Sequence, residues 1–349
     1  MNQIVCKPYS EAAKHDWDSF VRDAAKNATF LFERSYMDYH AQRFDDHSLM
    51  FMHENKTFPI ALLPACVAKG SETEGIIASH DGLTYGGLLI NGNVKATDVA
   101  QCLQMAAAEY LQRGFHTLRY KCVPHIYWKI PCQADTYWLF RAQAQLRARG
   151  LSSATDLAED IHLSELRRRG LHKAQKHNLL VTEAGNNPAL WAAFWEVLSE
   201  GLRQRHALNP VHTLDEMMLL HRNFPQQIRC WVVRTKGGEV VGGSVIYECK
   251  PVAHAQYINA SELGLELGAL DLLFHHLTNA YKARCHEGFR YFDFGISTEN
   301  QGRWLNEGLT FQKEGFGARS VTYDQYDVAL EKLAELRSHT ETNKKADQK

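Results

Sequence analysis

Residues 253–297 read AHAQYINASELG (253–264), LELG (265–268), ALDLLFHHLTNAYKARCHE (269–287), Gly288-Phe289 and RYFDFGIS (290–297). The last run is rich in aromatic residues, and the first carries Tyr257 and Ile258 at its centre; β-branched and aromatic residues of this kind are typical of strands. The long middle run repeats apolar residues at spacings of three and four, which predicts an amphipathic helix. The stretch therefore predicts a strand, a turn that contains Gly264 and Gly268, a helix and a second strand.

The same order of elements occurs a second time, at residues 81–122. There DGLTYGGLLI (81–90) predicts a strand with a Gly-rich turn, ATDVAQCLQMAAAEYLQR (96–113) a helix, and HTLRYKC (116–122) a strand after Gly114-Phe115. A predicted hairpin precedes each copy, at 49–68 and 230–249, and an aromatic helix precedes each hairpin. An internal duplication of this kind indicates two similar α/β domains.

The length of 349 residues also fits two domains, because roughly 150 residues make one. We place the N-terminal domain at 1–155 and the C-terminal domain at 156–330, since the segment LSSATDLAED (151–160) between them is short and polar. Residues 331–349 are predicted to form a charged C-terminal tail, with one amphipathic helix followed by a segment too polar to order itself.

Composition and charge exclude several classes of protein. The formal net charge is −1, so the molecule lacks the electrostatic signature of a DNA-binding or anionic-membrane-binding protein. The longest apolar stretch, PIALLPACVA (59–68), is about half the length that crosses a bilayer, and the N-terminus has no apolar leader. We therefore expect a cytoplasmic protein without membrane insertion. None of the eight cysteines forms a CxxC pair and the 18 histidines include no HExxH, so we expect reduced thiols and no metal site.

One segment, SELRRRGLHKAQKHNLLV (164–181), is basic along most of its length. The cations are Arg167, Arg168, Arg169, Lys173 and Lys176. The run fits a solvated helix face that packs on neighbouring leucines, and it also fits a patch that receives the phosphates of a nucleotide-bearing substrate. The residues alone leave both interpretations open.

Residues from about 190 to 326 resemble the GNAT acyltransferase fold in their order of helix, antiparallel hairpin, strand, turn, helix and strand. The closing segment NEGLTFQKEGFGARSVTYDQYDV (306–328) is similar to the late stretch of that family through Phe311, Lys313, Gly315 and Phe316. The whole chain resembles the tandem-GNAT, Fem-like branch. Some members of this branch attach amino acids to peptidoglycan precursors of the bacterial cell envelope, and others acylate amino sugars. The resemblance implies an α/β protein of two tandem GNAT-like domains, each a mixed, mostly antiparallel sheet flanked by helices.

The resemblance also implies an acyl-CoA site in the C-terminal domain. In a GNAT domain, the turn before the central helix offers backbone N–H groups to the pyrophosphate of acyl-CoA, at the positive end of the helix dipole. The matching residues here are Gly264, Gly268, Ala269 and Leu270. Leu265 stands where the family has a basic or amide residue.

The N-terminal copy lacks a phosphate-loop pattern, so we interpret it as a degenerate domain that serves the acceptor. Its loop CVPHIYWKIPCQADTYWLF (122–140) is rich in aromatic and amphipathic side chains, which suit sugar or nucleobase stacking. We expect His125, Tyr127 and Lys129 from this loop, together with Tyr85, to bind the acceptor substrate.

Acyl transfer to an amine needs removal of a proton and stabilisation of the carbonyl oxygen. In RQRHALNPVHTLDE (203–216) we expect His212 to take the proton, with His206 beside the substrate, although Thr213 and Glu216 also match a helix capping box. Lys313 resembles a lysine that Fem-like proteins place beside the acyl donor. Asp293 completes the predicted catalytic set, and Ser297 and Asn300 are expected to hold the acceptor.

The predicted function is N-acyl transfer, with acetyl as the favoured group, from acyl-CoA to the amine of an amino sugar or similar small acceptor, which includes nucleotide-linked sugars. A Fem-like aminoacyl-tRNA-dependent transferase is the first alternative, and it is less favoured because the net charge is near zero. A non-catalytic binding protein is the second, because Leu265 departs from the family pattern and Phe311 stands where many GNAT enzymes have the tyrosine that acts as the acid. The sequence leaves the oligomeric state open.

Overall fold

The computed structural model describes residues 3–71, 74–206 and 208–336, with the side chains of residues 205 and 206 excluded. Its contacts divide the chain into two compact units, Gly150–Thr322 and a first unit made of Met1–Arg149 with Tyr323–Lys349. Residues from Tyr323 belong to the first unit because their strand pairs there with residues 117–121. The predicted repeat boundaries, 1–155 and 156–330, stay a prediction, and residues 337–349 of the predicted tail lie outside the described residues.

The first unit contains two groups of strands and a long helix that backs them. Its helices are α1 (Lys14–Ser19), α2 (Arg34–Met37), α3 (Ala96–Gln112), α4 (Ala134–Arg141) and α11 (Leu330–Ala334), and its strands are β1 (Ile4–Pro8), β2 (Leu49–His53), β3 (Ala61–Leu63), β4 (Cys66–Val67), β5 (Ile76–Ala78), β6 (Leu89–Ile90) and β7 (Thr117–Lys121). One sheet has the order β1-β2-β3-β6, and β4, β5 and β7 are neighbours in a second. Strand β16 (Arg319–Ala329) pairs with β7 through Gln325–Ala329.

The predicted strand in residues 81–90 is largely wrong. Only Leu89–Ile90 is a strand there, and it pairs with β3. The parallel partner of β7 is β5, which lies just upstream of the predicted strand. His80 and Gly87 have positive φ angles of 69° and 86°, so the backbone turns repeatedly where the sequence pattern suggested an extended run. The predicted helix and second strand of this copy, α3 and β7, are confirmed.

The second unit contains a longer sheet. Its helices are α5 (Glu165–Lys176), α6 (Pro188–His206), α7 (Leu214–Asn223), α8 (Glu262–Leu267), α9 (Ala269–Ala283) and α10 (Glu307–Glu314), and its strands are β9 (Leu180–Glu183), β10 (Ile228–Arg234), β11 (Val240–Cys249), β12 (Val252–Ala260), β13 (Tyr291–Ile296), β14 (Thr298–Glu299) and β15 (Trp304–Leu305). Strand β8 (Gln145–Asp156) leads into this unit. The strand order is β8-β13-β12-β11-β10-β9.

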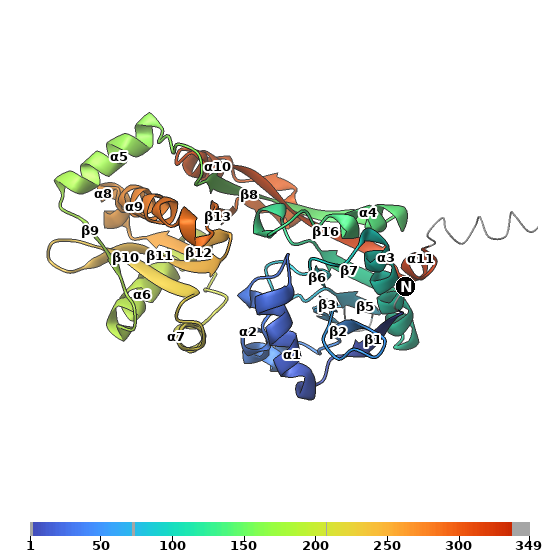
Figure 1. The fold of residues 1–349 in the computed structure, drawn as a ribbon. Coiled ribbons are helices and arrows are strands. Elements are labelled where there is room, and N and C mark those ends of the chain that lie inside the picture. The colour runs from blue at the N-terminus through green and yellow to red at the C-terminus, as the bar shows by residue number, and fades with distance from the viewer. Residues whose placement is uncertain (1–2, 72–73, 207, 337–349) are drawn as a thin grey trace, which may run out of the picture. The chain divides into compact units, whose positions relative to one another are not determined.

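Among the strand pairs described from β8 to β9, only β12–β13 is parallel. Helix α9 packs on one face through Leu273, Phe274 and Leu277, while α6 contacts β11 and β12 on the other (Figure 1). These pairings and covering helices confirm the predicted mixed, mostly antiparallel α/β architecture. None of the described helices combines the length and the hydropathy needed to cross a bilayer.

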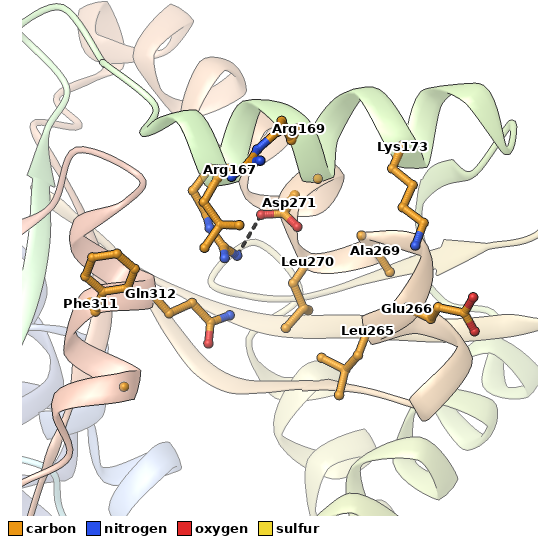
Figure 2. A pocket seen from close by; sticks show the side chains of 14 residues that line it. Arg167, Arg169, Lys173, Leu265, Glu266, Ala269, Leu270, Asp271, Phe311 and Gln312 are labelled. Carbon is orange, nitrogen blue, oxygen red and sulfur yellow. Dashed lines mark hydrogen bonds and ion pairs between the residues drawn. The ribbon is translucent and has the colours of Figure 1, made fainter.

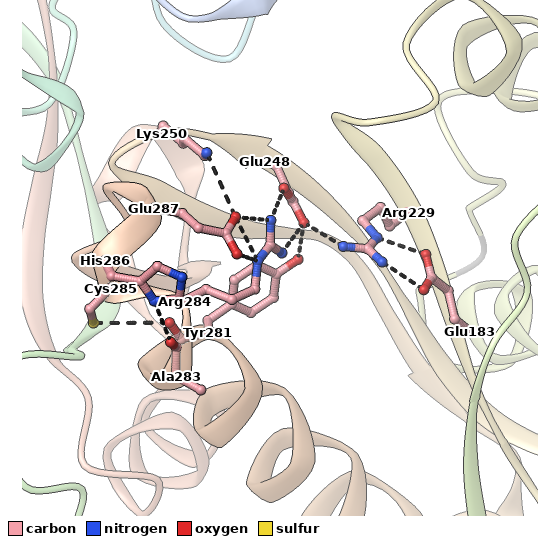
Figure 3. A network of polar contacts seen from close by, with 10 residues as sticks. All are labelled: Glu183, Arg229, Glu248, Lys250, Tyr281, Ala283, Arg284, Cys285, His286 and Glu287. Atoms are coloured by element: carbon pink, nitrogen blue, oxygen red, sulfur yellow. Dashed lines mark hydrogen bonds and ion pairs between the residues drawn. The ribbon is translucent and has the colours of Figure 1, made fainter.

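A buried carboxylate ties strands β10 and β11 to the end of α9. Glu248, whose side chain is 6% exposed, accepts hydrogen bonds from Arg229, Arg284 and the Tyr281 hydroxyl (Figure 3). Both guanidinium groups also bind a second acid, Glu183 or Glu287. Burial alone would raise the pKa of Glu248, but these donors outweigh burial and hold the pKa below its usual value.

Candidate functional site

A pocket of about 650 Å³ opens at the start of α9. Figure 2 shows that α5, the α8–α9 turn and α10 each contribute side chains to it. The lining residues are Leu166, Arg167, Arg169, Gly170, Lys173, Leu265, Glu266, Gly268, Ala269, Leu270, Asp271, Gly308, Phe311 and Gln312. The pocket therefore joins the turn predicted to bind acyl-CoA to the basic segment whose role the sequence left open.

Two glycines bring α5 against the α8–α9 turn. Gly268 has φ of +77°, and a Cβ built on it would lie 2.4 Å from the carbonyl oxygen of Gly170. A Cβ on Gly170 would lie 2.2 Å from an Asp271 carboxylate oxygen. Because neither position has room for a side chain, the backbones approach closely and the basic face of α5 borders the pocket.

The predicted turn itself differs from a simple loop. Residues 262–267 form the short helix α8, which Ser261 caps by accepting a hydrogen bond from the N–H of Gly264. Gly264 does not line the pocket: it is buried, and a Cβ there would lie 1.9 Å from the carbonyl oxygen of Val241. Ala269 and Leu270 begin α9, where the first N–H groups of a helix have no intrahelical partner.

The pocket carries more positive than negative charge. Burial raises the pKa of Asp271. The Arg167 guanidinium, which donates a hydrogen bond to the Asp271 carboxylate at 2.8 Å, partly offsets that rise. Arg169 and Lys173 are exposed and have no ion-pair partner within residues 3–71, 74–206 and 208–336. Glu266, also exposed, is the second acid in the lining. Two uncommitted cations beside a helix N-terminus suit a phosphate group.

The sheet of the second unit opens next to α9, between two of its strands. Strands β12 and β13 pair in parallel only through Val252–His254 and Tyr291–Asp293, although β12 continues to Ala260. Beyond His254 and Asp293, the two strands therefore diverge. Backbone groups that face such an opening can hydrogen-bond an extended amide-bearing ligand.

Three of the predicted site residues lie together at this opening. Lys313 on α10 is 5% exposed, and its Nζ donates to the carbonyl oxygens of Gly295 (2.7 Å) and Ile296 (3.1 Å) and to Ser297 Oγ (2.9 Å). Burial lowers the pKa of Lys313 to about 8, and the negative charge of Asp293 opposes that shift. All three N–H groups of the Lys313 ammonium therefore donate hydrogen bonds within the protein. To contact the oxygen of a reacting carbonyl, the ammonium would have to give up one of these bonds.

Asp293 is fully buried, and three hydrogen-bond partners that the sequence did not suggest hold its carboxylate. Its Oδ1 accepts from Ser152 Oγ at 2.5 Å and from the N–H of Gly295 at 3.0 Å, and its Oδ2 accepts from His254 Nδ1 at 2.9 Å. His254 and Asp293 face each other across the last β12–β13 pair. The sequence predicted both strands but not their register. Knowledge of the register would have shown that His254 and Asp293 are neighbours.

The predicted base, His212, contacts a tyrosine on β12. It is buried before α7, and its Nδ1 lies 2.5 Å from the hydroxyl of Tyr257 on β12. The capping box of Thr213 and Glu216 is confirmed at the start of α7. His206 ends α6, but its side chain lies outside the described part of the chain. Asn300 is exposed and has φ of +47° in the turn between β14 and β15.

The predicted acceptor residues of the first unit differ in exposure. Tyr85 and Tyr127 are buried, where Tyr85 Oη lies 3.1 Å from Thr29 Oγ1 and Tyr127 Oη lies 3.0 Å from Tyr323 Oη. His125 and Lys129 are exposed, and Lys129 Nζ donates to the carbonyl oxygen of Ala25 at 3.2 Å. In the described ranges, no group of three or more His, Cys, Asp or Glu side chains is arranged to hold a metal ion.

The close approach at Gly268 gives a first test of this geometry. We expect Gly268→Ala to lower the free energy of unfolding by about 1–3 kcal/mol, because the methyl group meets backbone and the positive φ is strained for alanine. Gly308→Ala is the matched control. Gly308 lines the same pocket, and the nearest atom to a Cβ built there is 3.8 Å away. Urea unfolding of both variants measures the difference, and equal stabilities would refute the close packing.

Comparison with known proteins gives matches for the domain and for the fold. Residues 164–303 match the family described as "Acetyltransferase (GNAT) domain". The comparison with curated proteins finds no significant match. The structure of FemX has a TM-score of 0.64 at 9% identity, over 93% of this chain and 96% of FemX.

Two further solved structures are similar. The C-terminal domain of a provisionally named lysylphosphatidylglycerol synthetase from Agrobacterium fabrum has a TM-score of 0.56 at 14% identity, over 92% of both chains. A tandem GNAT protein from the clavulanic acid biosynthesis pathway has a TM-score of 0.51 at 11% identity, over 94% of this chain and 99% of that one. Identities this low establish a shared fold and do not transfer a substrate. Residues 164–303 therefore match a GNAT acetyltransferase domain, and the chain as a whole shares the fold of FemX and of the tandem GNAT protein, in line with the resemblance seen in the sequence.

Proposed function

We propose that the protein is an N-acyltransferase that moves an acyl group, acetyl in the first instance, from acyl-CoA to the amine of an amino sugar or similar small acceptor. The observation that carries this proposal is the pocket at the start of α9, where Arg169 and Lys173 have no acidic partner in the described ranges. The pyrophosphate would lie against Gly268, Ala269 and Leu270, and the rest of the donor would run toward the opening between β12 and β13. No metal takes part in this proposal, and a cytoplasmic location is part of it.

The acceptor would meet the donor at that opening. Asp293, Ser297 and Lys313 lie there together, and Asn300 follows in the next turn. His125 and Lys129 stay candidates for acceptor binding because both side chains are exposed. The buried positions of Tyr85 and Tyr127 favour a role in holding their loop instead.

An aminoacyl-tRNA donor is a second candidate, which one feature of the structure favours. Helix α5 also carries Arg168 and Lys176, which are exposed and lie outside the pocket. A line of cations along a helix suits an RNA backbone, and such binding depends on all the cations and weakens steeply with salt. The structure of FemX shares the fold of this chain.

Two double variants with the same change in charge distinguish these donors. Arg169→Ala with Lys173→Ala should weaken CoA binding by about a hundredfold or more, because each of the two lost charged contacts contributes about 1.5 kcal/mol. Arg168→Ala with Lys176→Ala should change the affinity for CoA by less than about twofold. Calorimetric titration with CoA measures both.

If the wild-type protein shows no heat of binding with CoA, or if both pairs weaken binding equally, the pocket is not the donor site. Equal weakening of tRNA binding by the two pairs, with no response to CoA, would favour the aminoacyl-tRNA donor. Absence of binding to either would favour a non-catalytic protein.

A further inference from the structure

We infer that His254 is the general base of the acyl transfer, with Asp293 as its positioning residue, an inference that rests on the proposed function. The sequence prediction gave this task to His212. His212 is instead buried, with its Nδ1 at 2.5 Å from the Tyr257 hydroxyl. His254 lies where the parallel strands part.

The direction of the His254 side chain follows from its neighbours on β12. Ala253 and Ala255 belong to the core under α9, so His254 projects from the opposite face of the strand. Phe292 and Phe294 flank Asp293 in the same way on β13. The two polar side chains thus share the face of the sheet that lies away from α9, and they meet at the last parallel pair.

The contact with Asp293 fixes which imidazole nitrogen is available. A carboxylate only accepts hydrogen bonds, so the 2.9 Å contact places a hydrogen on His254 Nδ1 and leaves the lone pair of a neutral ring on Nε2. Nε2 has no hydrogen-bond partner within the described ranges and is not among the unpartnered buried atoms, so solvent reaches it. The side chain of His254 is 12% exposed.

The surrounding contacts keep this pair rigid. Ser152 Oγ and the N–H of Gly295 bind the other oxygen of Asp293, which prevents the carboxylate from turning away. Lys313 supplies a positive charge beside Asp293 from α10. A base that two flanking contacts orient in this manner can accept a proton without reorganisation.

His254 Nε2 first takes the extra proton of the acceptor's ammonium group, which frees the lone pair of the nitrogen. The neutral nitrogen then attacks the thioester carbonyl carbon. The tetrahedral adduct collapses, the C–S bond breaks, and the leaving thiolate takes the proton from the imidazolium, while the new amide nitrogen loses its second proton to solvent. The products are an amide, the CoA thiol and one released proton.

Carbethoxylation with diethylpyrocarbonate tests the inference without turnover, since the reagent modifies unprotonated imidazole. We expect His254 to react in the free protein and to react at least fivefold more slowly with saturating acetyl-CoA, as followed by peptide mass spectrometry. His15, whose side chain is 88% exposed in the first unit, should react equally in both conditions. An unreactive His254, or one that bound acetyl-CoA does not protect, would overturn the inference. Calorimetry separates this outcome from failure to bind acetyl-CoA, which would refute the proposed function and the inference together.

Kinetics with two acceptors distinguish a base from a structural residue. His254→Gln should lower kcat with glucosamine by about a hundredfold or more. The loss should be at least tenfold smaller with hydroxylamine, a weakly basic amine that carries no extra proton at neutral pH, and the affinity for acetyl-CoA should not change. Equal losses with both acceptors, or no loss with either, would show that His254 is not the base.

Discussion

Replacing Lys313 with methionine is expected to lower turnover by about a hundredfold or more. The ammonium is the positive charge buried beside Asp293, and loss of one preorganised charge at an acyl-transfer site has an effect of this size. Because the pKa of Lys313 is about 8, the contribution of its charge should be full below that pH and should fade as pH rises through it. Steady-state rates from pH 6 to pH 10, with free thiol as the readout, measure both effects.

Lys313→Arg is the control for charge, since it keeps a cation that stays protonated over this range. It should retain more activity than Lys313→Met and should lose the decline near pH 8. The methionine variant also leaves the carbonyl oxygens of Gly295 and Ile296 without this donor, so thermal unfolding must be recorded beside the rates. Normal turnover in a folded Lys313→Met protein would remove Lys313 from the catalytic set.

Removing the buried carboxylate of Glu248 is expected to cause the largest loss of stability, about 2–4 kcal/mol for Glu248→Ala. Two guanidinium groups and the Tyr281 hydroxyl would lose their shared acceptor, and although Arg229 and Arg284 each keep a second acid, a donor left without its partner costs about 1–3 kcal/mol. Glu287→Ala is the matched control: it removes another acid that binds Arg284, but a more exposed one, so little change is expected. Urea unfolding at pH 7 measures the free energies.

The effect of Glu248 should depend on pH in a defined direction. Its pKa in the folded protein lies below the ordinary value of 4.5, so its contribution is present above that pH and is lost as pH falls through the folded pKa. The stability difference between the wild type and Glu248→Gln should therefore shrink between pH 5 and pH 3. A constant difference over that range would contradict the assigned network.

The sequence predicted the elements of the second unit better than it predicted their contacts. Helix α9 begins at Ala269, as the apolar spacing indicated, because its periodic face packs on a sheet. The pairing of His254 with Asp293 depends on strand register, which long-range packing sets and local pattern does not. The basic segment likewise had two interpretations until the close approach of Gly170 and Gly268 placed it beside the pocket.

In the first unit, local pattern misled in two ways. Residues 81–88 have apolar and glycine residues in an order that suits a strand, but positive φ angles at His80 and Gly87 turn the chain. Tyr127 stands in an aromatic loop that suggested a sugar-binding surface, and yet it is fully buried against Tyr85 and Tyr323. Aromatic side chains contribute to cores as readily as to binding sites, and composition alone does not separate the two.

Transfer of an acyl group from acyl-CoA to an amine is the activity that we propose for this chain. The most direct measurement is release of free thiol when purified protein is mixed with acetyl-CoA and a panel of amino sugars, including nucleotide-linked ones. We predict thiol release that requires an acceptor and saturates with it, accompanied by an acetylated product of the matching mass. Binding of acetyl-CoA without acceptor-dependent thiol release across the panel, or no binding at all, would contradict the claim.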